Sequence, residues 1–133
     1  MRWRDNTQVR YFAMSRELVE KWIAYYQNRQ TVTNVLLPVW EQVDEIIDRD
    51  PEMGWLLVLD LVEAAPDDFI LATVAAGPLE NLLNNSPDLL VDRVDTEARR
   101  NPKFRRCLTG VWGLPTSIQS RIAKYLSTVV DPL

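Results

Sequence analysis

The sequence predicts an all-α protein of six to eight short helices in antiparallel hairpins, packed as a helical bundle or a short HEAT-like repeat stack. Three observations predict this fold. Apolar residues recur at helical spacing, prolines follow capping residues or glycine at intervals, and no stretch alternates as a half-buried strand would. At 133 residues with 47% hydrophobic side chains, one domain can bury a core without a disulfide or metal.

The first helix is predicted to begin at Ser15, because serine is a favoured N-cap. Trp22 and Tyr26 then fall on one apolar stripe. Residues 1–13 are accordingly expected to be an N-terminal extension, which precedes a single helical domain over residues 14–133.

The next two helices differ in polarity. The second, from about Leu36 to Arg49, is amphipathic, with apolar residues on one face and carboxylates on the other. The third, from Pro51 to Ala64, is apolar almost all round its centre, which is typical of a helix at the middle of a core.

Pairs of a capping residue or glycine with proline mark further helix starts, because proline at the first helical position loses no intrahelical bond. These pairs are Asp50-Pro51, Gly77-Pro78, Ser86-Pro87 and Asn101-Pro102. The later helices are therefore expected over residues 67–75, shortly after Gly77-Pro78, and over residues 87–100, 102–110 and 116–128.

A shift of 36 residues aligns several of these marks, such as Pro51 with Pro87 and Pro66 with Pro102. Two helices of that combined length form the unit of many helical repeats. Similar helices in series would also produce such a match, so both explanations stay open.

The residue types exclude several kinds of chemistry. The chain has no histidine and one cysteine, Cys107, which rules out an internal disulfide, a Cys/His zinc site and every nucleophile–histidine arrangement. Cys107 is expected to be a small buried residue. The absence of an apolar leader and of a run of about 20 apolar residues favours the cytoplasm and no contact with a membrane.

Charge is unevenly distributed along the chain. Residues 31–68 carry a net charge of −9 and residues 69–98 carry −4, whereas residues 1–30 carry +3 and residues 99–133 carry +6. An acidic middle between two basic ends suggests binding by charge complementarity.

Three segments are distinctive: Glu17–Tyr26, Ala76–Leu83 and Asn101–Trp112. Together they resemble a family of small, uncharacterised bacterial proteins with A-G-P-L-E-x-L-L and [DN]-P-x-F-R-x-x-L-x-G-V-W motifs. The resemblance covers roughly residues 15–115 and implies a compact helical fold and a bacterial source, but no activity. The family tends to have aspartate where Asn101 stands, and because both cap a helix, little is expected to change.

Carboxylates form the main candidate site for a partner. Spacings of three and four residues place side chains on one helical face. Such a face can dock a basic protein, or it can hold Mg²⁺ as in all-helical pyrophosphatases that cleave nucleoside triphosphates. The candidate residues are Glu41, Asp44, Glu45, Asp48, Asp60, Glu63, Asp67 and Asp68.

A second candidate interface combines basic and aromatic residues. The basic run can meet phosphates, but the chain is acidic overall, which makes nucleic acid an unfavourable partner and favours helix-dipole and ion-pair roles. The aromatic residues precede the first expected helix and are candidates for a dimer or partner contact. The set comprises Arg99, Arg100, Lys103, Arg105, Arg106, Trp3, Tyr11 and Phe12.

The segment Gly110–Pro115 has two glycines around Trp112. This pattern is typical of a tight turn between helices, and Trp112 is expected to be buried in the core.

The hypothesis that these observations favour is a non-catalytic protein that binds another protein, such as a bacterial immunity or antitoxin-like protein docking a toxin through its acidic face. No cofactor and no resident metal are expected. The alternatives are a Mg²⁺-dependent nucleotide pyrophosphohydrolase that uses the helix carboxylates, and a regulatory or scaffold subunit that associates with itself.

Overall fold

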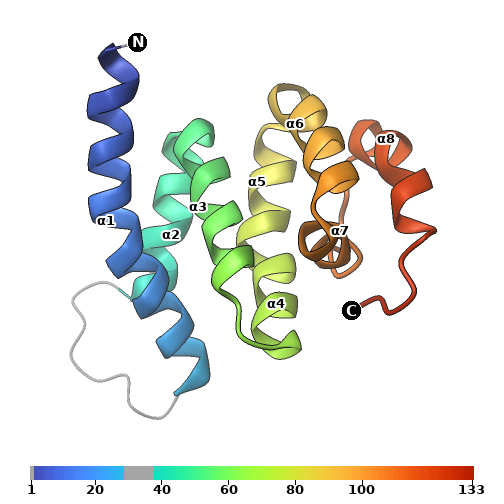
Figure 1. The fold of residues 1–133 in the computed structure, drawn as a ribbon, viewed down its shortest axis with the longest axis horizontal. Coiled ribbons are helices and arrows are strands. Elements are labelled where there is room, and N and C mark those ends of the chain that lie inside the picture. Colours follow the sequence, from blue (N-terminus) through green and yellow to red (C-terminus); the bar gives the residue numbers. More distant parts are fainter. Residues whose placement is uncertain (1, 29–37) are drawn as a thin grey trace.

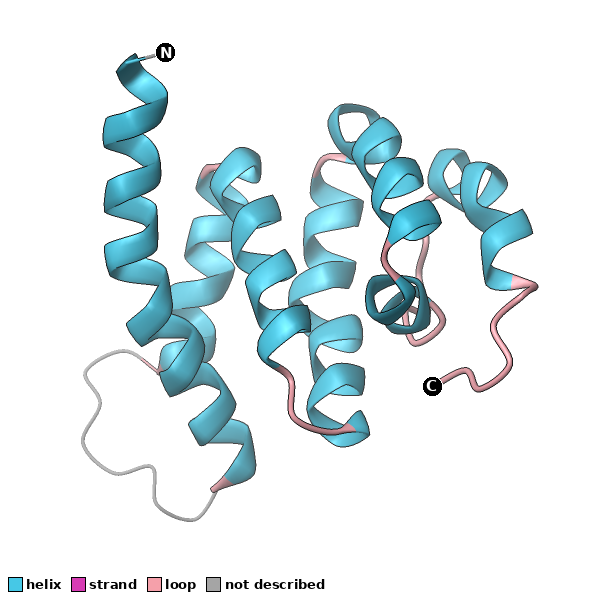
Figure 2. Cartoon of the chain, viewed as in Figure 1, coloured by secondary structure: helices cyan, strands magenta, loops and turns pink. Residues whose placement is uncertain are grey.

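The chain is all-α, as predicted, in a computed structural model that describes residues 2–28 and 38–133, with backbone only for residues 2–10 and 12–14. No strand occurs in these described ranges (Figure 2). The elements are α1 (Arg2–Gln27), α2 (Val39–Arg49), α3 (Pro51–Ala64), α4 (Asp68–Val74), a π-helical turn η2 (Ala75–Leu79), α5 (Glu80–Asn85), α6 (Pro87–Arg100), α7 (Pro102–Leu108) and α8 (Thr116–Leu126). Figure 1 shows α1 at one end of the assembly and α8 at the other.

Helix α1 begins earlier than predicted. It is continuous over 26 residues from Arg2, so the start expected at Ser15 is wrong. Ser15 lies inside the helix and is 3% exposed. No proline or glycine occurs from residue 2 to residue 27, and nothing in that stretch therefore interrupts a helix.

Helices α2 and α3 form a hairpin whose second start was predicted correctly. The Asp50 side chain accepts a hydrogen bond from the Met53 amide, and Pro51 is the first helical residue. The expected start of the preceding helix near Leu36 lies outside the described residues, and α2 is described from Val39 onward.

The helix start predicted at Gly77-Pro78 is wrong, because the chain runs from α4 through η2 into α5 without a break. Pro78 lacks an amide hydrogen, and in a regular α-helix its ring would clash with the carbonyl four residues earlier. The π-helical turn widens the backbone at this point and accommodates the proline inside the helix.

Helices α6 and α7 begin at the predicted prolines, Pro87 and Pro102. Asn101 caps α7 by accepting hydrogen bonds from the amides of Lys103 and Phe104, both at 3.1 Å. The Asn101 side chain thus caps α7 as the sequence indicated, whereas Ser86 precedes α6 without a capping hydrogen bond from its side chain.

The 36-residue shift corresponds to a structural unit. Helices α3 and α6 each span 14 residues from a proline, with starts at Pro51 and Pro87. Helices one unit apart also contact each other. The Asn81 amide bonds to the Asp44 carboxylate 37 residues earlier, and the Cys107 thiol lies 3.6 Å from the Leu71 carbonyl 36 residues earlier. Segments about 36 residues apart in the sequence therefore lie side by side in the all-α bundle.

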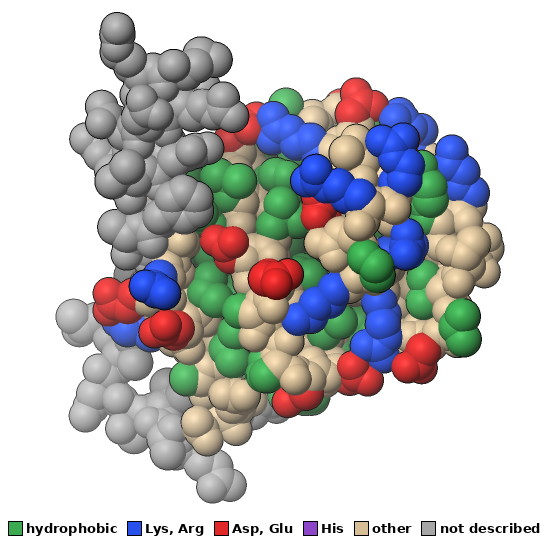
Figure 3. All heavy atoms as spheres, in the orientation of Figure 1, with side chains coloured by type: hydrophobic (Ala, Val, Ile, Leu, Met, Phe, Trp, Pro, Cys, Tyr) green, Lys and Arg blue, Asp and Glu red, His purple; other side chains and the backbone are tan. Residues whose placement is uncertain are grey.

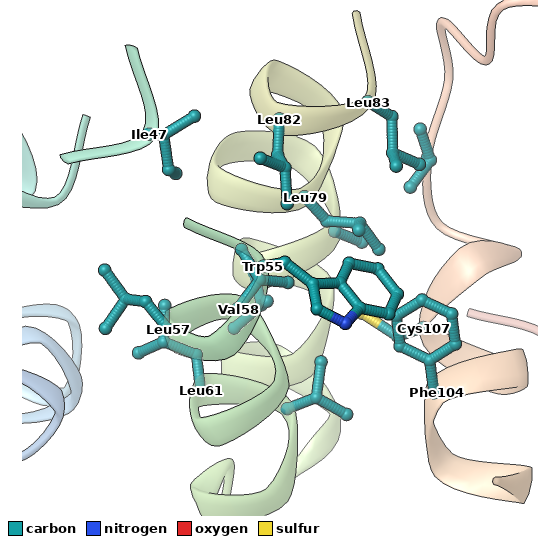
Figure 4. Close-up of a cluster of buried hydrophobic side chains, with 14 of the residues drawn as sticks. Ile47, Trp55, Leu57, Val58, Leu61, Leu79, Leu82, Leu83, Phe104 and Cys107 are labelled. Carbon is teal, nitrogen blue, oxygen red and sulfur yellow. The ribbon is translucent and has the colours of Figure 1, made fainter. Parts of the chain in front are cut away.

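The core lies along α3, as its apolar sequence predicted. Leu57, Val58 and Leu61 are fully buried, and Trp55 meets the ring of Phe104 edge-on with centroids 5.6 Å apart (Figure 4). Gly54 permits close packing here, because a Cβ atom at this position would lie 3.2 Å from the Ile47 backbone.

Candidate functional site

Helix α2 presents a carboxylate face to solvent. Its opposite face is buried through Val39, Val43 and Ile47, which fixes the orientation of the helix. Of the four acidic residues on the outer face, Asp44 is half-buried, and the other three are exposed: Glu41, Glu45 and Asp48. The structure therefore brings these four predicted residues together.

Two asparagines of α5 orient the carboxylates of this face. Asn81 Nδ2 donates to Asp44 Oδ1 at 3.3 Å, and Asn85 Nδ2 donates to Asp48 Oδ1 at 2.8 Å. Partial burial raises the pKa of the Asp44 carboxyl, and the neighbouring carboxylates of Asp48 and Glu41 raise it further, against the lowering effect of the Asn81 hydrogen bond. The ionised Asp44 is thus held in an unfavourable electrostatic environment.

Cations do little to neutralise the face. Within residues 2–28 and 38–133, the described ion pairs of the α2 carboxylates comprise one contact, between Arg49 and Glu45 at 2.7 Å. We call the set Glu41, Asp44, Glu45, Asp48 and the asparagines 81 and 85 the α2–α5 acidic face.

The other four predicted acidic residues lie elsewhere. Asp60 accepts a 2.7 Å hydrogen bond from the Tyr11 hydroxyl, and together with Glu63 it lines a hollow of about 570 Å³ between α1 and α3. Asp67 caps α4 through the Ile70 amide, and Asp68 pairs with Arg106. Asp60, Asp67 and Asp68 thus bond to residues outside the α2–α5 acidic face, and Glu63 lines the hollow beside α1.

The predicted basic run is largely occupied by contacts within the chain. Lys103 Nζ donates to the carbonyls of Glu63 and Ala65 at the end of α3, at 2.9 and 2.8 Å. Arg105 donates to the carbonyls of Ala98 and Arg99 at the end of α6. Cations at these positions offset the helix dipole, as one of the two interpretations predicted.

The remaining arginines of the run also have acidic partners or solvent contact. Arg106 forms a two-pronged contact with Asp68, at 2.6 and 2.9 Å, and Arg100 bonds to Glu97, whereas Arg99 is exposed. Figure 3 shows lysine and arginine side chains gathered over α6, α7 and α8. None of the described contacts of the five cations of this run is with a carboxylate of the α2–α5 acidic face.

Of the three aromatic candidates, the structure describes the side chain of Tyr11. Tyr11 is 1% exposed and bonded to Asp60, so it belongs to the core and does not offer an exposed contact. Burial raises the pKa of its hydroxyl, and the Asp60 carboxylate adds to this effect. The side chains of Trp3 and Phe12 lie outside the described residues.

Trp112 is exposed, and the prediction that it is buried in the core is wrong. Its side chain is 94% exposed, whereas its neighbour Val111 is 8% exposed and occupies the inward position of the turn. Two glycines indicated a tight turn, but they did not indicate which side chain of that turn faces the core.

Helix α5 holds this turn by three hydrogen bonds. Glu80 Oε1 accepts from the amides of Trp112 and Gly113, at 3.1 and 3.3 Å, and Asn84 Nδ2 donates to the Gly113 carbonyl at 2.8 Å. Glu80 belongs to the A-G-P-L-E segment and Trp112 to the G-V-W segment. The two distinctive segments therefore meet in the fold, and their joint occurrence in the sequence was the signal for this contact.

The model of a family of unknown function, DUF6869, matches residues 26–130. The chain belongs to this family. No curated protein and no solved structure matches the chain significantly. The predicted resemblance to an uncharacterised family is thus confirmed at this level.

The region matched by the DUF6869 family includes α2, α5 and the turn that carries Trp112, but it leaves out Tyr11. In the described part of the chain, no group of three or more acidic or cysteine side chains is arranged to hold a metal ion. None of the described helices is both long enough and apolar enough to cross a membrane.

Proposed function

We propose that this member of the DUF6869 family is a non-catalytic protein that binds a basic partner protein through the α2–α5 acidic face. The observation that supports this proposal is the pair of hydrogen bonds by which Asn81 and Asn85 hold Asp44 and Asp48 at the surface. Carboxylates on a solvated helix surface do not require hydrogen bonds from a neighbouring helix to stay exposed. Carboxylates held in place lose little conformational entropy when a partner binds.

Charge supports a basic partner over a neutral one. Burial disfavours ionisation of Asp44, and the carboxylates of Asp48 and Glu41 lie close enough to disfavour it further. A cationic side chain from a partner would relieve this repulsion at the moment of binding. Among the described residues, Arg49 pairs with Glu45, but no described cation pairs with Asp44, Asp48 or Glu41.

The more specific form of the proposal is a bacterial immunity or antitoxin-like protein that covers the basic site of a toxin. A small acidic chain without histidine suits this role, because blocking a site requires surface complementarity and no reactive group. The Mg²⁺-dependent hydrolase and the self-associating scaffold stay predictions, and no described contact favours either of them.

The direct test is affinity capture of proteins from the source organism with two baits, the wild-type chain and a variant with Glu41→Gln, Asp44→Asn, Glu45→Gln and Asp48→Asn. We expect the wild type to capture a basic protein whose retention falls as salt rises, because surface charge pairs are screened. The variant should lose most of this capture.

A matched control is Asp88→Asn, which neutralises an exposed carboxylate on α6 at a distance from α2 in the sequence. This control should retain the partner as well as the wild type does. Capture of no protein, or capture that the four neutralising changes leave unaffected, contradicts the proposal.

A further inference from the structure

An indole that is 94% exposed is unusual for a folded chain, because tryptophan has the largest apolar surface to remove from water. Among the described residues, Trp112 is the most exposed aromatic side chain, ahead of Phe69 at 53% and Trp40 at 40%. Tryptophan is also the residue type most enriched among the energetic centres of protein interfaces.

The turn that carries Trp112 is fixed by side chains, since its two amides and the Gly113 carbonyl bond to Glu80 and Asn84. The Asn84 side chain is itself held in place, because its Nδ2 atom also donates to the Glu80 backbone carbonyl at 2.8 Å. The indole is therefore presented from a rigid backbone. A rigid anchor loses less freedom on binding than one on a loose loop.

This turn adjoins the α2–α5 acidic face. Asn81, Asn84 and Asn85 are spaced by three and four residues, which places them on one side of α5. Asn81 and Asn85 bond to the carboxylates of α2, while Asn84 bonds to the turn. The side-chain amides on this side of α5 thus connect the α2 carboxylates to the turn that carries Trp112.

Glu80 adds a further negative charge at the backbone of the turn that carries Trp112. Its Oε1 atom accepts both turn amides, and its Oε2 atom lies 3.7 Å from the position that a Cβ atom would take on Gly113. No described cation pairs with Glu80 in residues 2–28 or 38–133. The Glu80 carboxylate is therefore available to a partner cation at the turn that carries the indole.

We propose that Trp112 is the anchor of the α2–α5 acidic face, and that its indole enters an apolar recess on a partner protein bordered by arginine or lysine side chains. This inference rests on the proposed function and adds the residue that contributes most to binding. The partner chemistry follows from charge complementarity, since α5 holds the Trp112 turn through Glu80 and bonds to the carboxylates of Asp44 and Asp48 through Asn81 and Asn85.

The test uses a short peptide of alternating arginine and leucine as the probe, with a glutamate–leucine peptide of equal length as its counterpart. The chain is labelled with 5-fluorotryptophan, and the Trp112 resonance is identified from the Trp112→Phe variant. We expect the arginine–leucine peptide to shift the Trp112 resonance to saturation, and the glutamate–leucine peptide to leave it unmoved.

Two variants separate the anchor from the turn. Trp112→Ala should weaken peptide binding, measured by calorimetry, by about tenfold or more, as truncation of an interface centre does. Asn84→Ala loosens the turn without a change of charge and should weaken binding by a smaller factor. Val130→Ala is the matched control, because Val130 is 98% exposed, and it should bind as the wild type does.

The variant Asp44→Asn with Asp48→Asn separates this inference from the proposed function. If these two changes weaken peptide binding while Trp112→Ala does not, Trp112 is not the anchor, and the proposed role of the α2–α5 acidic face is supported. If Trp112→Ala weakens binding and the two aspartate changes do not, the proposed function fails and Trp112 acts without the face. An unmoved Trp112 resonance, or an equal response to both peptides, overturns the inference.

Discussion

Asp44 carries a carboxyl group whose ionised form is disfavoured in the folded chain. Its pKa is raised by burial and by neighbouring carboxylates, so the folded state disfavours its ionised form at neutral pH. Asp44→Asn removes this charge, and its Oδ1 atom can still accept the Asn81 hydrogen bond. We expect the melting temperature to stay the same or rise, while partner binding weakens.

The comparison that makes this result informative is Asp68→Asn. The Arg106 guanidinium lowers the pKa of the Asp68 carboxyl, chiefly through their hydrogen bonds. The pKa shift of Asp68 is therefore opposite in direction to that of Asp44, and its ionised form stabilises the fold. We expect the Asp68 variant to melt below the wild type, and a clearly lower melting temperature for the Asp44 variant would contradict this interpretation of the acidic face.

The pH dependence of stability follows from the same carboxyls. The pKa values of Asp68 and Asp95 are lowered by hydrogen bonds from Arg106 and Arg121, respectively. Their contribution is full above the ordinary carboxyl pKa of about 3.9 and is lost as pH falls through the lowered folded values. Urea unfolding at a series of pH values should show stability falling below about pH 4, and Arg121→Met should flatten part of this fall.

Cys107 is expected to be unreactive in the folded chain. Burial raises the pKa of its thiol to about 12, so very little thiolate exists at neutral pH. A disulfide reagent such as Ellman's reagent should label it only after denaturant is added. Rapid labelling of the native chain would show that α7 opens readily from the core.

Side-chain direction in the Trp112 turn could not be predicted from residue types. Val111 and Trp112 are adjacent and both apolar, and the structure buries Val111 and exposes Trp112. Tyr11 presents the reverse case, since it lies in a polar and basic segment but is buried against α3 with its hydroxyl bonded to Asp60. In both cases, contacts with residues far away in the sequence decide which side chain is buried: Asp60 for Tyr11, and Glu80 of α5 for the Trp112 turn.

At the scale of helices, the boundaries set by capping side chains were predictable from sequence. Asp50, Asp67 and Asn101 each cap a helix through a side-chain oxygen. The Gly77-Pro78 pair was not predictable in the same way, because a π-helical turn can hold proline inside a continuous helix. The sequence alone does not distinguish a break from such a turn.

Asn101 does more than cap α7. Its Nδ2 atom donates to Glu97 Oε2 at 2.8 Å, and Glu97 is 7% exposed. We expect Asn101→Ala to lower the free energy of unfolding by about 2 kcal/mol, through the lost cap and the lost hydrogen bond to Glu97 Oε2. Urea unfolding measures this change.

Asn101→Asp tests the two roles separately. Aspartate preserves the cap but places a carboxylate against Glu97, so we expect the exchange to lower stability more than capping alone predicts. The loss should be large at neutral pH and smaller at about pH 4, where a carboxyl takes up a proton. A loss that is independent of pH would mean that repulsion between these two groups is unimportant.

At the scale of the whole molecule, charge segregation and the repeat were visible in the sequence, but their arrangement was not. The 36-residue shift indicated similar units, and contacts such as Asn81–Asp44 and Arg106–Asp68 show how neighbouring units meet. The same contacts decide which acidic residues are neutralised. The basic run pairs with Asp68 and with helix ends, and none of its described contacts is with a carboxylate of α2.

The most direct test of this account is amide hydrogen exchange of the chain, measured free and bound to the partner that it captures. The account predicts slowed exchange in α2, in α5 and above all at the Trp112 and Gly113 amides, whose hydrogen bonds to Glu80 lie at the surface. Slowed exchange confined to the hollow between α1 and α3, or to the basic surface over α6, α7 and α8, would contradict it.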